Sequence, residues 1–299
     1  MIKCKKVHQV KISVITPFYK GNKYLPKYFE CLQKNKEHLQ CELEVILVND
    51  SPAEVVDVGS CGMLDVKVIN LEINSGIHFA RVKGLKQATG EYVMLLDQDD
   101  LLADDALNKL FSEIVNADAD LVISNAELEQ KDDSVLWYRT DYHKSLVWDK
   151  KTYINVGNQI MSPGQCLIKK SEIPEKWCEN ILKNNCCDDY YLWLLMIDKA
   201  KVSYLDESLY VHSYTGSNVS ADTEITYVSS MEMIHYLRRD ESLTVNELNT
   251  LYKMVDYKYK FKLSGKFKKL VLSIRNLSIV LTNIMYKKKT QTAYGFNRY

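Results

Sequence analysis

The sequence predicts an α/β protein built on a mainly parallel, Rossmann-like sheet with helices on both faces. Short apolar runs rich in β-branched residues alternate with longer segments in which apolar residues recur at helical spacing. Polar residues cluster at the ends of three of the apolar runs, at Tyr19, Asn49-Asp50 and Asp97 to Asp100. Ligands of such sheets lie at the carboxyl ends of the strands, so the same pattern predicts one functional crevice there.

The apolar runs predict buried strands over residues 11–16, 43–48, 66–71, 91–96 and 119–124. Helical spacing predicts helices over residues 22–36, 76–88, 104–115 and 188–199, and a helical pattern from residue 226 onward. Thr89-Gly90 follows the second helix in the manner of a glycine C-cap. Residues 126–160 are polar with scattered aromatic residues, which is typical of a loop-rich region, and a strand is expected over 201–205.

The net charge of the chain is zero, but it is unevenly distributed. Residues 240–299 hold twelve Lys and Arg against four Asp and Glu, so the preceding residues carry an equal excess of acid. An acidic body lacks the basic face that nucleic-acid binding needs, which argues against a nucleic-acid partner. The basic end of the chain can instead meet an anionic surface such as a membrane.

The cysteines and the first residues favour a cytoplasmic protein. No two of the eight cysteines form a Cys-x-x-Cys pair, so zinc-site spacing is absent and reduced thiols in the cytosol are expected. The first eleven residues are polar and basic, which predicts no signal sequence. Residues 270–286 are short for a bilayer span and are interrupted by Arg275, Asn276 and Asn283, so we expect no transmembrane helix.

An acidic cluster, Asp97-Gln98-Asp99-Asp100, follows the fourth predicted strand and places three carboxylates within four residues. A divalent cation is the simplest relief of their mutual repulsion. Mg²⁺ and Mn²⁺ prefer oxygen ligands and often bind through one or two carboxylates, with phosphate oxygens and water completing the shell. The alternative is that Asp99 and Asp100 cap the next helix, although a cap needs one Asp rather than three.

Several short motifs run in order along residues 10–125. They are Ile12-Ser-Val-Ile-Thr-Pro-Phe-Tyr19, Val48-Asn-Asp-Ser51, Asn74-Ser-Gly76, Ala80-Arg81, Gly84, Ala88-Thr-Gly-Glu-Tyr92 and Leu96-Asp-Gln-Asp-Asp100, and Cys187-Asp-Asp-Tyr-Tyr-Leu192 follows later. As a set, they resemble the family 2 glycosyltransferases of GT-A fold. The resemblance implies a bacterial, polysaccharide-type enzyme whose donor is a nucleotide-diphospho-sugar, with UDP the expected nucleotide, and whose cofactor is Mn²⁺ or Mg²⁺.

The resemblance also divides the chain. Residues 1–225 would form the GT-A domain, with a nucleotide-sugar and metal half over 1–125 and an acceptor half over 126–225. Residues 226–299 would form a basic, helical extension. The sugar, the acceptor and the linkage depend on the shape of the acceptor half, which the sequence does not give.

On the donor side, the resemblance places Pro17, Tyr19 and Asp50 at the nucleotide, with Asp50 accepting a base N–H. Asn49 stands where the family usually has Asp, which keeps hydrogen bonding but loses a charge. Arg81 is expected either to contact the nucleotide or to brace the acidic cluster. The alternative for Arg81 is a purely structural ion pair.

Within the acidic cluster, Asp97 matches the first Asp of the family's Asp-x-Asp motif and Asp99 the second. The resemblance implies that Asp97 and Gln98 lie at the donor diphosphate. Asp99 is the first choice for direct metal ligation, with Asp100 close behind.

On the acceptor side, Asp189 matches the family's general base, and Asp188 replaces the more usual Glu. One base opposite the leaving group implies a single displacement with inversion, and the acceptor would be a hydroxyl of a glycan or a lipid-linked saccharide. A helix N-cap pair is the alternative for Asp188 and Asp189. The stretch from Leu209 to Ser220 lacks the family's Tyr-Arg-x-His pattern, so His212 is expected to replace the arginine at the phosphates. Gln165 is expected to line the acceptor pocket.

The basic end of the chain has two interpretations. Residues 253–289 mix lysines with apolar and aromatic residues, as in an amphipathic helix that lies on the inner membrane leaflet near lipid-linked acceptors. The same pattern is expected of a basic helix packed on the acidic body.

Other classes fit the sequence less well. A haloacid-dehalogenase-type phosphatase needs Thr or Ser where Leu101 stands, and a nucleotidyltransferase needs a glycine-rich basic loop after its first strand. No Gly-x-Gly-x-x-Gly follows a predicted strand, which disfavours a dinucleotide-binding enzyme. A non-catalytic sugar-nucleotide or glycan-binding protein stays an alternative, although Asp97, Asp99 and Asp189 together argue against it.

Overall fold

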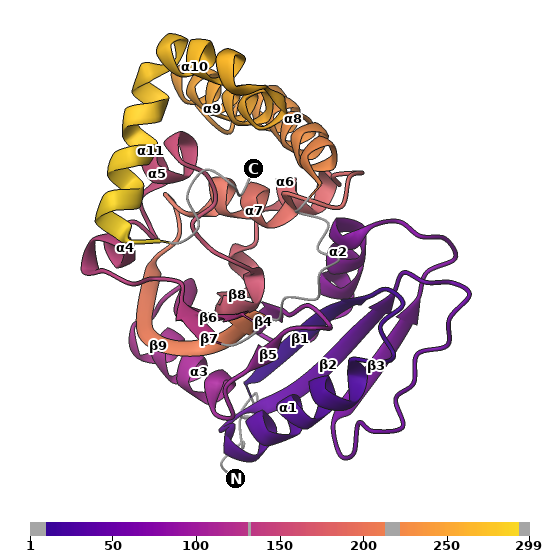
Figure 1. Ribbon diagram of the computed structural model, residues 1–299. Helices are drawn as coiled ribbons and strands as arrows, with labels where there is room; N and C mark the ends of the chain where they lie inside the picture. The colour runs from indigo at the N-terminus through magenta and orange to yellow at the C-terminus, as the bar shows by residue number, and fades with distance from the viewer. Residues whose placement is uncertain (1–9, 131–132, 213–221, 293–299) are drawn as a thin grey trace.

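The computed structural model describes residues 10–130, 133–212 and 222–292. They form a nine-stranded mixed sheet in the order β3-β2-β1-β4-β8-β6-β9-β5, with β7 paired to β6 (Figure 1). The strands are β1 (Lys11–Phe18), β2 (Glu42–Asn49), β3 (Asp65–Asn70), β4 (Tyr92–Leu95), β5 (Leu101–Leu102), β6 (Leu121–Gln130), β7 (Asp133–Leu136), β8 (Cys166–Lys169) and β9 (Val202–His212).

The parallel part of the sheet comes from the first predicted strands. β3, β2, β1 and β4 are parallel neighbours, joined through α1 (Leu25–His38) and α2 (Ile77–Gln87). The chain moves in one direction along the sheet through α1 and in the other through α2. Right-handed crossovers therefore place these two helices on opposite faces, which confirms the predicted α/β architecture.

The second half of the sheet is mixed. β8 runs antiparallel between β4 and β6, and β9 runs parallel to β6 with a register shift near Ser124 and Asn125. α3 (Ala106–Asn116) packs against β6, β8 and β9 on the same side as α1. The short β8 was not predicted because its four residues give too brief a pattern to read as a strand.

The region 126–160 is more ordered than predicted. β6 continues to Gln130 and pairs with β7, and α4 (Asp141–Ser145) and α5 (Lys150–Asn155) follow. Side-chain caps begin both helices, since Thr140 accepts from the His143 amide and Asp149 accepts from the Thr152 amide. The prediction of a loop-rich region was therefore wrong over most of this stretch.

The predicted glycine C-cap was also wrong. Ala88 ends α2 in an extended conformation, and Gly90 lies against the backbone of β1. A Cβ at Gly90 would lie 2.8 Å from the carbonyl oxygen of Lys11 and from the amide nitrogen of Ser13. Gly90 is thus required for close approach of two chain segments rather than for helix termination.

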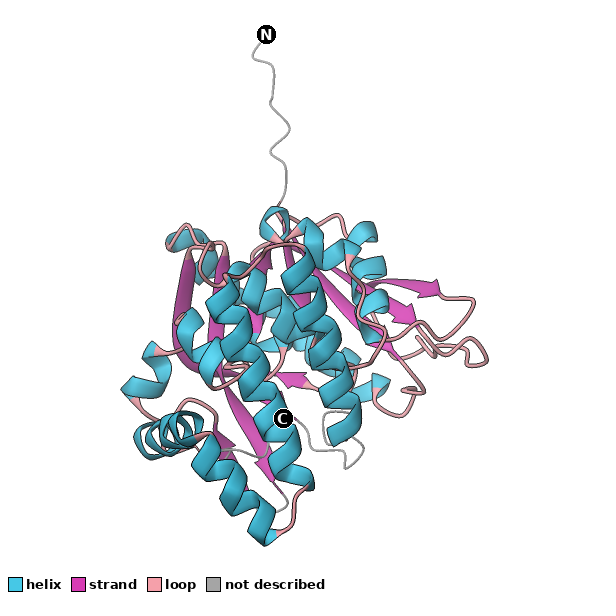
Figure 2. Cartoon of the chain, turned by 90° about the horizontal axis from the view of Figure 1, so that it is seen from above, coloured by secondary structure: helices cyan, strands magenta, loops and turns pink. Residues whose placement is uncertain are grey.

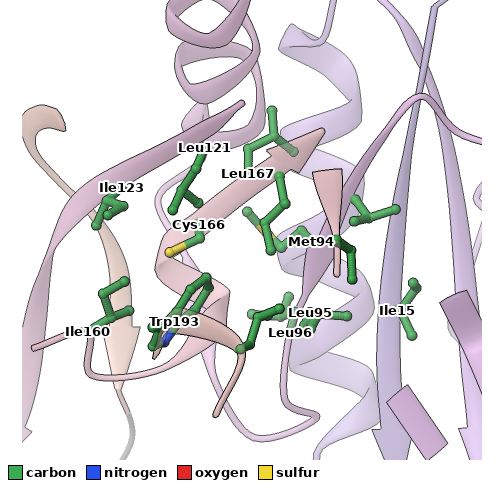
Figure 3. Close-up of a cluster of buried hydrophobic side chains, with 14 of the residues drawn as sticks. Ile15, Met94, Leu95, Leu96, Leu121, Ile123, Ile160, Cys166, Leu167 and Trp193 are labelled. Atoms are coloured by element: carbon green, nitrogen blue, oxygen red, sulfur yellow. The ribbon is translucent and has the colours of Figure 1, made fainter. Parts of the chain in front are cut away.

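Part of the hydrophobic core lies where the sheet meets α7 (Asp188–Met196). In Figure 3, side chains of β1, β4, β6 and β8 point toward one another, and Trp193 of α7 lies beside Leu96 and Ile160. All of these side chains are at most 1% exposed. Tight packing here fixes α7, whose first residues Asp188 and Asp189 belong to the predicted site.

The helical pattern predicted from residue 226 appears as four helices, α8 (Thr223–Arg239), α9 (Val245–Leu263), α10 (Lys266–Arg275) and α11 (Leu277–Thr290). α8 packs along α9, α9 contacts α5, and α11 returns to α4 (Figure 1). The view from above in Figure 2 looks onto these helices, with the strands beyond them. α9 and α11 therefore pack on the body of the protein, as the second interpretation of the basic region predicted.

None of the helices in the described ranges is both long enough and apolar enough to cross a membrane. The remaining short helices are η1 (Pro163–Gln165), η2 (Lys170–Glu172) and α6 (Glu175–Glu179). η1 lies just before β8, η2 and α6 follow β8 on the way to α7, and α6 contributes the fully buried Trp177 to the core.

Candidate active site

A cavity of about 670 Å³ opens at the carboxyl ends of β1, β2 and β4. It runs from the loops after these strands to the first turn of α7 and to the C-terminal helices. The predicted site residues that line it are Pro17, Tyr19, Asp50, Arg81, Asp97, Gln98, Asp99, Asp100, Asp188, Asp189 and His212. Residues separated by almost two hundred positions thus meet in one cavity, where the parallel sheet predicts a ligand.

Arg81 joins the two halves of this cavity. Its Nη2 lies 2.5 Å from Oδ1 of Asp97, and its Nη1 lies 2.7 Å from Oδ2 of Asp188. The Arg81 side chain is only 3% exposed, and the Asp188 side chain 4%. Arg81 therefore forms ion pairs with both the acidic cluster and the first turn of α7 and ties the two together, while its contact with a nucleotide stays a prediction.

These contacts separate the two aspartates electrostatically. Burial alone would raise the pKa of Asp188, but attraction to Arg81 lowers it below the ordinary value, with a smaller effect from His78. Burial raises the pKa of Asp97, and repulsion from Asp100 adds to this, although Arg81 opposes both. Asp188 is thus held as the charged partner of Arg81.

Asp100 faces the side of the cavity formed by β9. Its carboxylate accepts a hydrogen bond from the Tyr210 hydroxyl, and Nδ1 of His212 lies 3.1 Å from its Oδ1. Asp100 is 2% exposed. The carboxylate is thereby oriented by two side chains, and His212 lies next to the acidic cluster, where a phosphate contact was predicted.

Asp99 is half-buried and lies between Asp97 and Asp100 in the acidic cluster. Burial, then Asp100 and Asp97, raise its pKa to about 7. Within the described ranges, no three His, Cys, Asp or Glu side chains are grouped so that they alone could hold a metal ion. The donor set nevertheless suits Mg²⁺ or Mn²⁺, because these cations need only one or two carboxylates when diphosphate oxygens and water complete the shell.

Asp189 lies at the start of α7 and has a different environment from Asp188. The side-chain amide of Asn158 donates to its Oδ2 at 2.8 Å, and the backbone N–H of Tyr190 donates to its Oδ1 at 2.7 Å. Burial and repulsion from Asp188 raise the pKa of Asp189 to about 7, against the attraction of Arg81. A carboxylate whose pKa lies near neutrality is suited to accept a proton.

The end of the cavity that was predicted to hold the nucleotide is built from the loops after β1 and β2. The Asp50 carboxylate accepts the backbone N–H groups of Ser75 and Gly76, at 2.6 and 2.8 Å, and so holds the start of α2. The Gln98 amide accepts the N–H of Tyr19 and donates to its carbonyl oxygen, both at 3.0 Å. These bonds fix the loop that presents the Tyr19 ring, which is 47% exposed, to a ligand.

The structure corrects the prediction for Gln165. This residue is 0% exposed and is not among those that line the cavity. Its Oε1 accepts the N–H of Met161 at 2.6 Å, and its Nε2 donates to the carbonyl oxygen of Ser124 at 3.0 Å. Gln165 closes a capping box with Ser162, and its side chain satisfies buried backbone groups instead of facing the cavity.

The sequence interpretation missed several residues that line the cavity, among them Asn158 after α5, Lys258 on α9, and Asn283 and Tyr286 on α11. Lys258 stands seven residues after the buried Leu251, with the buried Met254 and Val255 between them, so it occupies the inward face of α9. A lysine at an apolar helical position was the one signal in the sequence that could have placed α9 at the site.

Comparison with known proteins agrees with this geometry. The model of Glycosyl transferase family 2 matches residues 13–170, which is more than half of the chain. The chain therefore belongs to the family 2 glycosyltransferases.

Two curated relatives illustrate the match. The chain is 30% identical to glycosyltransferase GlyG of Streptococcus pneumoniae over 43% of its own length and 44% of GlyG. It is 33% identical to YwdF of Bacillus subtilis, an uncharacterized glycosyltransferase, over 50% of its own length and 57% of YwdF. The matched part thus spans about half the length of these relatives.

Among solved structures, residues 1–349 of Staphylococcus aureus TarS in complex with UDP-GlcNAc have a similar fold. The TM-score is 0.61 and the identity 20%, over 85% of this chain and 74% of the TarS chain. At this identity the likeness shows the fold, which is that of the GT-A glycosyltransferases, as predicted.

The Arg81 bridge gives a testable prediction for stability. Arg81→Met leaves two carboxylates uncompensated in a buried site, and this should lower the free energy of unfolding by ~3–5 kcal/mol. Denaturant unfolding at neutral pH measures the change. Lys201→Met is the matched control, because its pair with Asp118 is 59% and 92% exposed and should change stability by at most about 1 kcal/mol. Equal effects of the two variants would contradict the structural role of Arg81.

Proposed function

We propose that this protein is an inverting glycosyltransferase that moves a sugar from a nucleotide-diphospho-sugar to a hydroxyl of a glycan or lipid-linked saccharide. The observation that carries the proposal is the Arg81 bridge, which places the acidic cluster and the first turn of α7 in one cavity. The donor-side carboxylates and the candidate base thus face the same space, as a single displacement requires. Membership of family 2 supports the reaction class.

The donor would lie along the parallel strands. Tyr19, Pro17 and Asp50 line the end assigned to the nucleotide, and Asp97 and Gln98 line the part assigned to the diphosphate. TarS, which shares the fold, has been crystallised with UDP-GlcNAc, and this supports UDP as the nucleotide. His212, beside Asp100, would lie near the phosphates in place of the family's arginine.

Asp99 and Asp100 would hold Mn²⁺ or Mg²⁺. The bound cation would supply positive charge to the diphosphate as it leaves. The raised pKa of Asp99 supports this assignment: burial raises it most, the neighbouring carboxylates of Asp100 and Asp97 raise it further, and a bound cation would offset these effects. Asp100 is already oriented by Tyr210 and His212, so its carboxylate would need little rearrangement.

Asp189 would act as the general base. Its carboxylate would take the proton of the acceptor hydroxyl while the hydroxyl oxygen forms a bond to the anomeric carbon. The bond from that carbon to the diphosphate oxygen breaks, and its electron pair leaves with the nucleoside diphosphate. Attack opposite the leaving group inverts the configuration, and the proton stays on Asp189 until solvent removes it.

Replacement of Asp189 tests this role directly. Asp189→Asn should lower turnover by ~10²–10⁴-fold, because an amide cannot take the proton, while nucleotide binding is retained. In the wild type, turnover should rise with pH through about 7 and level off above it, since the base acts only in its charged form. Release of nucleoside diphosphate measures turnover, and calorimetry measures binding.

Asp206→Asn is the control, because Asp206 is a surface partner of Lys144 and lies outside the cavity. Unchanged turnover in Asp189→Asn would exclude Asp189 as the base. Nucleotide binding without turnover in the wild type, over a full panel of sugar nucleotides and acceptors, would favour the non-catalytic binding protein.

We further propose that the protein is cytoplasmic and binds the inner face of the membrane through α10 and α11. Every residue of α10 is exposed or half-buried, and its large apolar side chains are among the most exposed of the described residues. These side chains, with those that flank them, are Leu263, Phe267, Leu270, Ile274, Leu277, Leu281, Ile284 and Met285. Lys266, Lys268 and Lys269 lie in the first turn of α10 and Arg275 ends it, which favours an anionic lipid surface as the occupant.

Vesicle sedimentation tests the membrane contact. The protein should bind vesicles that contain phosphatidylglycerol and lose most of this binding in high salt or with neutral phosphatidylcholine vesicles. Phe267→Glu with Leu270→Glu should abolish binding, whereas Met63→Glu, an exposed residue far from α10 in sequence, should not. Point substitutions are preferable to truncation, because removing α9 and α11 would also remove Lys258 and Tyr286 from the cavity wall. Equal binding of both variants would refute the proposed contact.

A further inference from the structure

The loop between α5 and η1 carries the only side chain in the described ranges seen to donate a hydrogen bond to the carboxylate of Asp189. Asn158 gives its Nδ2–H to Oδ2 of Asp189 at 2.8 Å, while its own Oδ1 accepts the N–H of Ile160 at 3.1 Å. Both ends of the Asn158 amide are therefore engaged. The position of Asp189 depends on where this loop lies.

Two residues of the C-terminal helices hold the loop, one on each side of Asn158. Nζ of Lys258, on α9, donates to the carbonyl oxygen of Val156 at 2.5 Å. The hydroxyl of Tyr286, on α11, donates to Oε1 of Gln159 at 2.8 Å. Val156 and Gln159 flank Asn158 closely, so α9 and α11 together leave little freedom to the residue that contacts Asp189.

The Tyr286 contact belongs to a buried network. Nε2 of His143 lies 3.0 Å from the Tyr286 hydroxyl, and burial lowers the pKa of His143 to about 4, so its ring is neutral. Since the hydroxyl hydrogen goes to Gln159, Nε2 of His143 must be the donor to the Tyr286 oxygen. The side-chain amide of Gln159 also donates to the carbonyl oxygen of Gly157 at 2.7 Å.

The main chain at Gln159 is fixed as well. Its carbonyl oxygen accepts from Nε1 of Trp137 at 2.8 Å and from the Tyr138 hydroxyl at 3.0 Å. Gln159 is 1% exposed, and Lys258 is 5% exposed. Burying a lysine ammonium costs free energy unless it is hydrogen-bonded. The bond from Lys258 to the loop carbonyl offsets part of this cost and holds the loop in place.

We propose that Lys258 and Tyr286 are positioning residues for the reaction: they hold residues 156–159 so that Asn158 orients the carboxylate of Asp189. The inference rests on the proposed role of Asp189 as the base. It makes α9 and α11 part of the catalytic unit rather than an appended region. The hydrogen bond from Asn158 also favours the charged form of Asp189, so loosening the loop should raise the pKa of that carboxyl.

Several other groups face Asp189 and set the baseline of its titration. They are the charged side chains of Arg81, Asp97 and Asp188, the thiols of Cys166, Cys186 and Cys187, and the phenol of Tyr190. Tyr286→Phe removes no charge, so an effect of this variant on the titration of Asp189 must pass through the loop. Lys258→Met removes a charge from the wall of the same cavity, so for this variant the exchange of the loop amides is the deciding readout.

The experiment uses the full chain without any ligand. The titration of Asp189 is followed by NMR of ¹³C-carboxyl-labelled aspartate, with Asp189→Asn identifying its signal. Tyr286→Phe and Lys258→Met should each raise the midpoint of this titration, and Asn158→Ala should raise it most. Amide hydrogen exchange over residues 156–161 should become faster by between about twofold and tenfold, the factor that corresponds to one lost hydrogen bond.

Matched controls lie on α9, next to Lys258. Tyr259→Phe removes a hydroxyl that donates to Glu224 at 2.6 Å, and Lys260→Met removes a surface partner of Asp256. Neither residue lines the cavity, and both variants should match the wild type in titration and exchange over the loop. A merely structural role for Tyr286 would lower the melting temperature while leaving the midpoint of Asp189 unchanged, and this result would overturn the inference.

Turnover provides the last readout. With the sugar nucleotide that gives activity in the wild type, Tyr286→Phe should lower kcat and shift its pH profile upward while leaving KM for the donor unchanged. If Tyr286→Phe does not fold, Lys258→Met tests the other side of the loop independently. Failure of the proposed function would appear as unaltered turnover in Asp189→Asn, and it would leave the titration and exchange results in place.

Discussion

Arg81 lies between two carboxylates that come from opposite halves of the chain. One belongs to the loop after β4 and the other to the first turn of α7, and all three side chains meet at the edge of a cavity. A buried guanidinium holds two carboxylates at fixed places because its two Nη groups donate in fixed directions. Without this bridge, repulsion among the buried aspartates would open the site. The charge of Asp188 is used in this bridge, which leaves the neighbouring Asp189 available for chemistry.

The parallel part of the fold was predictable because its sequence signals are local. Apolar runs mark β1, β2, β3 and β4, and the polar residues after them fall at one sheet edge by the geometry of parallel strands. Asp97, Asp99 and Asp50 could therefore be placed from the sequence. The contacts that each of these carboxylates makes could not be predicted. Those of Asp50 with the backbone N–H groups of Ser75 and Gly76, for example, depend on how the loop before α2 closes.

The mixed part of the fold was less predictable for a physical reason. Its strands are short or irregular, and its contacts join segments far apart in the chain. No local sequence pattern therefore predicts these contacts. Asn158 meets Asp189 across 31 positions, and Tyr286 meets Gln159 across 127. Gln165 was misplaced on the cavity wall because a glutamine that satisfies buried backbone groups looks, in sequence, like one that faces a ligand.

The central claim is that the acidic cluster binds a cation together with a nucleoside diphosphate. Thermal unfolding with a panel of UDP-sugars, with and without Mn²⁺, tests it most directly. A nucleotide at a hundred times its Kd stabilises a protein by about 2.7 kcal/mol, which corresponds to a rise of several degrees in Tm. The structure predicts such a rise only when Mn²⁺ is present, and its loss in Asp99→Asn. If no nucleoside diphosphate stabilised the protein in a metal-dependent way, the assignment of this cavity would be contradicted.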